Sequence, residues 1–399
     1  MSASGFAVLD LETTGFFPLL DDRIVELAVI HLDPDGAVEG TWDTLIEPYR
    51  DLGLDTHGIT ADDLVGAPTF AQVAPRLIEL LDGRIVVAHN AAFHLPFLNA
   101  ELVRAGYTGE PIRALCTMQL AREFLPGAGR TLQDALDAYD LELADEHRAS
   151  AEASGTASLV TAYLHQNPQS PSWSAVAPAS LTPVDGDDVE WMPRRPTPGR
   201  AASFLQRITI KLPEFSGPAE QLDYLALLDR CLIDRQLTTH EASALVDLAE
   251  NLGISRTTCE ELHHQYFEEL SAIAWADGQL SEEEVHDLVA VGQLLSIPAG
   301  MVERSMQPFA LSPVTPAAPT AGSFTLSPGD IVVFTGELAR PISVWRTRLV
   351  GRDYVVSEAV TRNTKILVAA DPEVVSGKVS KALDYGVPIV AESALDGLL

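Results

Sequence analysis

The chain has 399 residues, 46% of them hydrophobic, and a formal net charge of −31. At roughly 100 to 200 residues per domain, this length predicts two or three folded domains rather than one core. The negative charge argues against nonspecific binding to duplex phosphates, because that binding draws on clustered Lys and Arg.

Residues 1–165 mix expected strands and helices, which predicts an α/β domain. Strands are expected in FAVLDLE (6–12), RIVELAVIHL (23–32) and RIVVAH (84–89). Helices are expected in FAQVAPRLIELL (70–81), LPFLNAELVRAG (95–106) and TLQDALDAY (131–139).

Two stretches lack periodic apolar residues and are rich in Pro and Ser, namely 166–218 and 308–323. Such segments bury too little apolar area to offset the entropy of ordering them, so both are interpreted as linkers. They divide the chain into an α/β domain (1–165), a middle domain (219–307) and a C-terminal domain (324–399).

The middle domain is predicted to be purely helical, and it contains a repeat at one constant offset. Asp234, Leu237, Glu241, Leu245, Leu252 and Ile254 recur as Asp277, Leu280, Glu284, Leu288, Leu295 and Ile297. Thr238 with Glu241 and Ser281 with Glu284 each fit a capping box, in which hydroxyl and carboxylate satisfy amides at a helix start. Metal binding by Asp234, Asp277 and neighbouring acids is the alternative.

The C-terminal domain is predicted to be a small parallel sheet flanked by helices. Strands are expected in IVVFTGEL (331–338), YVVS (354–357), KILVAAD (365–371) and PIVAES (388–393), with a helix in KVSKALDYG (378–386). The order of these elements gives the whole chain a multidomain organisation of α/β, all-α and small α/β parts.

The cysteines and the N-terminus indicate a cytoplasmic protein. Cys116, Cys231 and Cys259 are odd in number and form no CxxC pair, so buried reduced thiols are expected. The first residues show neither a basic nor an apolar leader region, and charges interrupt the long apolar stretches, so neither a signal peptide nor a membrane span is expected.

The segment FAVLDLETTG carries the clearest chemical signal. The strand period of two places Asp10 and Glu12 on the same face near the end of an apolar strand. Two like charges beside a core repel each other and lose hydration, so they persist most readily with a cation between them. Solvated acids on an exposed edge strand are the alternative.

This string resembles the first motif of the DEDDh exonucleases, a family that includes the proofreading subunit of bacterial replicative polymerases. VVAHNAAFHLPFL (86–98) resembles the second motif and HRASAEA (147–153) the third. The resemblance implies an RNase H-like fold and a metal-dependent 3′-to-5′ exonuclease with two divalent ions, Mg²⁺ or Mn²⁺, held by four carboxylates. Asp10 and Glu12 would be ligands, and His147 the general base.

Two positions depart from the family pattern. His94 stands at the usual Asp of the second motif, and Glu152 at the usual Asp of the third. Imidazole weakens the hold on a hard cation but can ligate Zn²⁺ or Mn²⁺. Two interpretations stay open: an active enzyme whose metal set (Asp10, Glu12, Glu152 and His94) has a shifted preference, and a domain that has lost catalysis and grips strand ends.

Substrate contacts are expected from the loop after Glu12, where Thr13, Thr14 and Gly15 could face the terminal nucleotide. Asn90 is either a turn former or a substrate contact. Phe93 could stack on a base, but an apolar residue at a helix start is more often core. No element that reads base sequence is apparent, which fits an enzyme acting on single-stranded DNA ends through backbone and stacking contacts.

The middle and C-terminal domains also resemble known families. ADGQLSEEE (276–284) resembles the TerB-like helical domains, and VVFTGEL, TKILVAAD and SGKVSKALDYGVPIV resemble a BRCT domain. In phosphate-binding BRCT members the matching positions, Thr335, Gly336 and Lys378, form an anion pocket, with Ser376 as a helix cap. Leu395 stands near the place of the family's usual tryptophan. A scaffold role through protein contacts is the alternative to binding a DNA 5′ phosphate.

These observations predict an exonuclease that processes DNA 3′ ends in repair or proofreading, tethered by its C-terminal domain. The competing interpretation is a catalytically degenerate end-binding or scaffold protein. RNA trimming would use the same fold and metals, and no residue distinguishes it.

Overall fold

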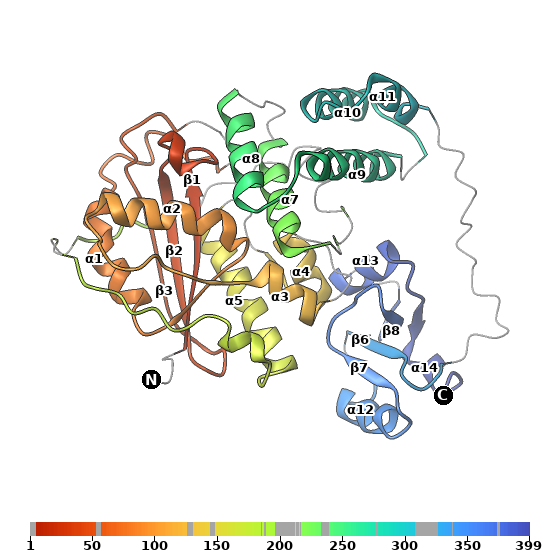
Figure 1. Cartoon of the computed structure of the whole chain (residues 1–399). Helices are drawn as coiled ribbons and strands as arrows, with labels where there is room; N and C mark the ends of the chain where they lie inside the picture. Colours follow the sequence, from red (N-terminus) through yellow and green to blue (C-terminus); the bar gives the residue numbers. More distant parts are fainter. Residues whose placement is uncertain are drawn as a thin grey trace.

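The computed structural model describes most of the chain (Figure 1). The described residues are 5–52, 57–125, 131–143, 148–184, 186, 189–195, 212, 215, 217–232, 239–275, 278–307, 326–336, 338–372 and 376–399. No helix in these ranges is both long enough and apolar enough to cross a membrane.

The N-terminal domain is built on a mixed sheet of five strands in the order β3-β2-β1-β4-β5. The strands are β1 (Phe6–Thr13), β2 (Ile24–Leu32), β3 (Val38–Leu45), β4 (Ile85–Ala88) and β5 (Leu115–Cys116). β1 pairs antiparallel with β2 and parallel with β4. The three expected strands are therefore confirmed, and β1, which carries the acidic motif, lies at the centre of the sheet.

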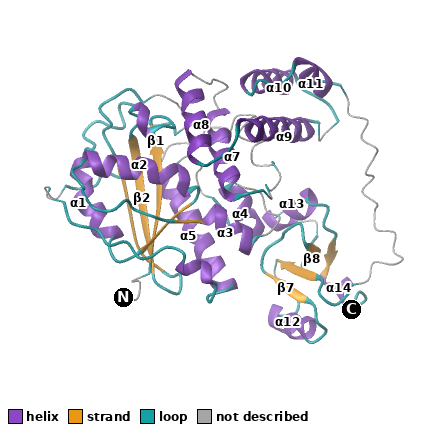
Figure 2. Ribbon diagram, in the orientation of Figure 1, coloured by secondary structure: helices purple, strands orange, loops and turns teal. Residues whose placement is uncertain are grey.

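Helices cover both faces of this sheet, as the ribbon in Figure 2 shows. They are α1 (Phe70–Leu81), α2 (Ala91–Arg104), α3 (Thr117–Phe124), α4 (Leu132–Tyr139) and α5 (Ala149–Gln166), with short 3-10 turns at η1 (Pro18–Leu20) and η2 (Pro171–Ser174). Leu9 and Leu11 belong to one core cluster with α1 and α2, whereas Val8 belongs to another with α3, α4 and α5. The three expected helices are present, and Thr69 and Thr131 begin two of them with capping boxes.

Much of segment 166–218 packs against the N-terminal domain, which corrects its interpretation as a linker. Trp173 is buried, and its ring contacts Phe6 edge-on and Phe124 at a tilted angle. Further on, Leu45 N–H donates to the carbonyl of Met192, and Arg194 is buried. A few aromatic, apolar and cationic residues are enough to hold the segment against the domain. The high overall content of Pro and Ser predicted a linker because composition does not register such isolated residues. Segment 308–323 lies outside the described residues.

The middle region is helical, as predicted. Its helices are α7 (Ala219–Leu232), α8 (Thr239–Asn251), α9 (Arg256–Ala274), α10 (Glu282–Leu294) and α11 (Ala299–Ser305). The constant offset of the sequence repeat maps α8 onto α10 from end to end. Ser281 caps α10 and forms the predicted capping box with Glu284. Thr238, Asp234 and Asp277 lie outside the described residues.

The C-terminal region is a four-stranded, wholly parallel sheet in the order β7-β6-β8-β9. It contains β6 (Ile331–Thr335), α12 (Ile342–Val350), β7 (Val355–Ser357), β8 (Thr364–Ala369), α13 (Gly377–Asp384), β9 (Ile389–Ala391) and α14 (Glu392–Leu395). The predicted parallel sheet is confirmed. Leu395, the last residue of α14, is fully buried in the same core cluster as Trp345.

The three cysteines are free thiols. Cys116 and Cys231 are buried, as expected. Cys259, near the start of α9, is only partly buried and packs against the edge of the helical core.

Candidate functional site

Strand β1 brings Asp10 and Glu12 into the interior of the N-terminal domain. Both side chains are almost fully buried, with 1% and 7% of their surface exposed. They alternate along β1 with Leu9 and Leu11, whose side chains belong to the core cluster with α1 and α2. The period of two along a strand therefore places the two carboxylates on one face of the sheet and the two leucines on the other. The alternative of solvated acids on an exposed edge strand is therefore wrong.

Helix α5 supplies a third carboxylate, Glu152, in its first turn. Its charge raises the pKa of both Asp10 and Glu12, second only to the effect of burial. Both pKa values therefore stand well above their ordinary range. Three carboxylates gathered in this way destabilise one another, and a cation among them would relieve that repulsion.

His94 on α2 lies beside Asp10, with its Nε2 atom 3.3 Å from Asp10 Oδ1. The imidazole is 1% exposed, and burial is the main reason its pKa falls well below the usual value, so it is neutral. Neither of its ring nitrogens has a hydrogen-bond partner among the described residues, and the same holds for Asp10 Oδ2. Buried polar atoms without partners carry a cost of about 1–3 kcal/mol each, which a bound cation can offset.

The donor chemistry of these residues fits divalent cations, since three carboxylates and a neutral imidazole are all metal ligands. However, among the described ranges no three His, Cys, Asp or Glu side chains are already close enough to hold an ion together. His147, the expected general base, lies outside the described residues. The acids singled out from the sequence, Asp10, Glu12 and Glu152, therefore lie in one region of the fold. In the described part of the structure they are not close enough together to form a complete ligand set.

The loop after β1 is held internally by its own polar groups. Thr13 Oγ1 donates to the carbonyl of Gly15, and Thr14 Oγ1 donates to Asp22 and accepts from the amide of Arg23. A Cβ atom on Gly15 would come within 2.4 Å of the Asp22 carboxylate, so a larger residue here would displace the Asp22 side chain. Any contact of these residues with a nucleotide would therefore come from backbone groups.

Asn90 and Phe93 lie at the start of α2. Asn90 is buried and adopts a positive φ of 55°, which Asn tolerates better than most residues, so it acts as a turn former here. Phe93 is 5% exposed and packs against Phe16 and Phe97, which confirms the expected core role.

Three charged residues near the site escaped the sequence analysis. Glu26 pairs with Glu12 across β1 and β2, is fully buried and forms an ion pair of 3.1 Å with Arg194. Arg230, from α7, lies over the Phe93 ring with its guanidinium carbon 4.1 Å from the ring centroid. A charged residue inside the apolar run IVELAVIHL could have drawn attention to Glu26, whereas the two arginines come from distant segments and left no signal.

In the C-terminal region, two of the three predicted phosphate-binding residues, Thr335 and Lys378, contact the N-terminal domain. Thr335 Oγ1 donates to Asp140 Oδ2 at 2.8 Å, and the Lys378 amide donates to Asp140 Oδ1 at 3.2 Å. Ser376 caps α13, as expected. Gly336 adopts a positive φ of 81° after β6. The Lys378 ammonium group points inward to the carbonyl of Phe334, so it lies beside the pocket rather than facing an outside ligand.

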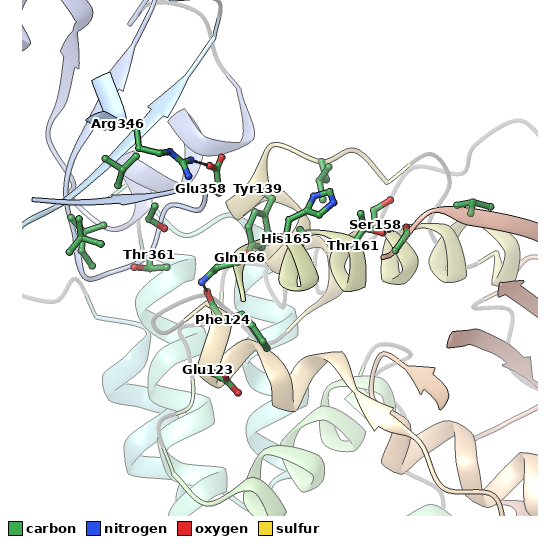
Figure 3. Close-up of a pocket in the computed structure, with 18 residues that line it drawn as sticks. Glu123, Phe124, Tyr139, Ser158, Thr161, His165, Gln166, Arg346, Glu358 and Thr361 are labelled. Atoms are coloured by element: carbon green, nitrogen blue, oxygen red, sulfur yellow. Dashed lines mark hydrogen bonds and ion pairs between the residues drawn. The ribbon is translucent and has the colours of Figure 1, made fainter. Parts of the chain in front are cut away.

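A large cleft of about 1040 Å³ opens between the N-terminal domain and the C-terminal sheet. Figure 3 shows Tyr139, His165 and Gln166 on one wall and the ion pair of Arg346 with Glu358 on the other. None of its lining residues belongs to the Asp10, Glu12 and Glu152 cluster. The cleft is therefore separate from the candidate catalytic site.

Comparison with known proteins identifies the N-terminal domain. A family model described as "Exonuclease" matches residues 7–160. DNA polymerase III subunit epsilon of Treponema pallidum is 33% identical over 154 residues, which cover 37% of this chain and 71% of that protein. The chain belongs to the exonuclease family. Its mixed-sheet N-terminal domain is accordingly RNase H-like.

Other similar proteins are larger or structurally more distant. The 3′-5′ exonuclease DinG of Bacillus subtilis is 30% identical over 175 residues, but the chain spans only 19% of that protein's length. A solved structure of exonuclease X in complex with 5′ overhanging duplex DNA is 24% identical, with a TM-score of 0.35 over 41% of this chain and 94% of that chain.

Proposed function

We propose that the chain is a metal-dependent 3′-to-5′ exonuclease that removes nucleotides from DNA 3′ ends. The observation that carries the proposal is the buried, mutually repelling set of Asp10, Glu12 and Glu152, with unpartnered polar atoms on Asp10 and His94. Membership of the exonuclease family and the similarity to a polymerase subunit epsilon and to DinG support it.

In this proposal, Asp10, Glu12 and Glu152 are the residues that would hold divalent ions, Mg²⁺ or Mn²⁺, and His94 would widen the choice to Zn²⁺. When bound, such ions supply Lewis-acid stabilisation of the charge that develops on the phosphodiester. The rigid position of β1 at the centre of the sheet fixes Asp10 and Glu12 against the repulsion of the substrate phosphate.

His147 is the proposed general base, because imidazole is the side-chain group whose reference pKa, near 6.5, suits proton transfer around neutrality. It takes a proton from a water molecule whose oxygen attacks phosphorus. The bond from phosphorus to the 3′ oxygen of the preceding nucleotide breaks, and that oxygen gains a proton. The products are a nucleoside 5′-monophosphate and a strand shortened by one residue.

The helical and C-terminal regions have a proposed role in bringing the exonuclease domain to its substrate. The helical region resembles TerB-like domains and the C-terminal region resembles BRCT domains. We propose that the C-terminal region links the exonuclease to protein partners or DNA ends during repair or replication-associated processing.

The test is digestion of a 5′-labelled single-stranded DNA with Mg²⁺, Mn²⁺ or Zn²⁺. We expect a ladder that shortens from the 3′ end, no ladder in EDTA, and loss of at least ~10²-fold in rate for Asp10→Ala. Asp35→Ala, an exposed acid in the same domain, is the matched control. Cleavage that persists in Asp10→Ala would refute the assignment of the site.

A second candidate function is binding to strand ends without chemistry. The replacement of a carboxylate by the neutral, buried His94 and the unassembled ligand set favour it. Fluorescence anisotropy with labelled single-stranded DNA discriminates the two. Binding without cleavage in wild type, together with cleavage in His94→Asp, would establish the second function.

A further inference from the structure

Helix α4 of the exonuclease domain and helix α13 of the C-terminal region lie against each other (Figure 1). α4 is anchored in its own domain, because Leu132, Ala135 and Leu136 are buried in the core cluster with α3 and α5. An acid stands at each end of this helix, with Asp134 in the first turn and Asp140 directly after the last residue. Both acids contact the C-terminal region.

The Asp140 carboxylate lies in the anion pocket that the sequence predicts for a phosphate. Its Oδ2 atom accepts a hydrogen bond of 2.8 Å from the Thr335 hydroxyl, and its Oδ1 atom accepts one of 3.2 Å from the amide of Lys378, the second residue of α13. The next amide of that helix, on Val379, donates to the Ser376 cap instead. The carboxylate thus occupies the donors that a phosphate oxygen would need at this helix start.

An ion pair between Asp134 and Lys381 forms the second point of contact. Both residues are almost fully buried, with 1% and 5% of their surfaces exposed. Asp134 Oδ2 also accepts from the Thr131 hydroxyl at 2.9 Å within the capping box of α4, so its carboxylate is held by its own helix. Such a buried pair keeps the two regions together, because separating it inside the protein would leave an unpaired buried charge.

The backbones of the two regions also approach each other closely. A Cβ atom on Gly377 would lie 2.9 Å from the Asp137 carbonyl oxygen, so the absence of a side chain permits the approach. The Val360 amide donates to the Ala138 carbonyl at 3.0 Å. Ala359, from the same loop, is buried in a core cluster of the exonuclease domain. The contact therefore extends beyond helix α13.

We propose that the anion pocket formed by Thr335, Ser376 and the Lys378 amide is a docking site within the chain, with the Asp140 carboxylate as its ligand. While Asp140 is bound, the C-terminal region is held on the exonuclease domain and the pocket is closed to phosphate. Partners of the C-terminal region must therefore bind elsewhere on it or displace Asp140. This docking does not depend on whether the exonuclease site is active.

Lysine acetylation of the full-length protein tests the docking in wild type. Lys381 is buried against α4, whereas Lys365, on strand β8 of the same region, is exposed. Acetic anhydride should therefore modify Lys381 at least about tenfold more slowly than Lys365, as measured by mass spectrometry of the peptides. Equal rates at the two lysines would overturn the inference without the need for any variant.

Asp140→Gly removes the ligand and should leave α4 intact, because glycine suits the positive φ of 63° at the end of this helix. Lys381 should then be acetylated about tenfold faster than in wild type, since one of the two points of contact is lost. Asp353→Gly is the matched control, an exposed Asp with a φ of 62° in the C-terminal region, and should not change the rate. An unchanged rate in Asp140→Gly would contradict the role of Asp140 as the ligand.

Inorganic phosphate tests whether the pocket is closed. Hydrogen exchange is followed over residues 376–382, with phosphate in place of chloride at equal ionic strength. Phosphate should slow exchange in Asp140→Gly, whose pocket lacks the carboxylate, and should leave wild type unchanged. Equal slowing in wild type would mean that the pocket is open, and slowing in neither protein would mean that it is not an anion site. Either of these results would overturn the inference.

Discussion

At the scale of single residues, the site combines acids that oppose folding with a histidine that carries no charge. Asp10 and Glu12 lose hydration and repel Glu152, which lowers the stability of the fold. Leu or Val at these buried positions would make the fold more stable. Such an arrangement is typical of a functional site rather than of a structural one.

The first prediction concerns the stability of the metal-free protein. Burial raises the folded-state pKa of Asp10 above its unfolded value, so stability is fully present below the unfolded pKa and is lost as pH rises through the folded pKa. In EDTA, Asp10→Asn should therefore be more stable than wild type at pH 8, with a smaller difference near pH 4. Urea unfolding at the two pH values measures it.

Asp35→Asn, an exposed change, should alter neither curve. Adding Mn²⁺ should raise the midpoint of wild type more than that of Asp10→Asn. A variant less stable than wild type at pH 8 in EDTA would contradict the account of the buried acids.

The residues of the first motif could be predicted because a strand period of two is enough to place Asp10 and Glu12 together. The environment of His94 could not be predicted, since its neutrality depends on burial on the inner side of α2 and on Arg230, which is far away in the chain. The sequence shows residue types, whereas the charge state depends on neighbours that only folding provides.

At the scale of elements, strands and helices with regular apolar spacing were predicted correctly. β3 was missed, because most of its residues are exposed or half-buried and its sequence VEGTWDTL has no apolar face. α5 was not recognised as a helix, because small residues (Ala149, Ala153, Gly155 and Ala157) form the buried side of its first half, and large buried apolar residues begin only at Leu159. Small residues let α5 approach the sheet closely and bring Glu152 near β1.

The second prediction concerns the capping box of α10. Ser281 accepts from the Glu284 amide and its own amide donates to the Glu284 carboxylate. Ser281→Ala should lower the free energy of unfolding of the helical region by about 1 kcal/mol, whereas Ser281→Asp, which keeps the acceptor, should not. Thermal unfolding monitored by circular dichroism measures both, and equal losses would contradict the capping role.

At the scale of the whole molecule, the domain order could be predicted but the contacts between regions could not. The return of segment 166–218 to the sheet depends on Trp173 and Arg194, which stand isolated in a Pro-rich stretch. The contacts of Arg230 with Phe93 and of Asp140 with Thr335 join residues far apart in the sequence, and a single sequence carries no periodic signal for them.

The third prediction tests whether the returning segment stabilises the domain. Arg194→Met leaves the buried Glu26 without its ion pair and should cost roughly 3–5 kcal/mol at neutral pH. The loss should shrink at acid pH, because burial raises the Glu26 pKa and the carboxyl then becomes neutral. Adding Glu26→Gln should recover part of the stability. A loss below ~1 kcal/mol at neutral pH, measured by urea unfolding, would mean that the segment contributes little.

The measurement that tests the central claim most directly is release of mononucleotides from a 3′-labelled single-stranded DNA. Wild type and Asp10→Ala are compared in Mg²⁺, Mn²⁺ and Zn²⁺ under conditions where both proteins are folded. We predict that wild type releases labelled nucleoside 5′-monophosphate with at least one of these ions and that Asp10→Ala does not. Silence of wild type with all three ions, while it still binds the strand, would contradict the claim that this site is catalytic.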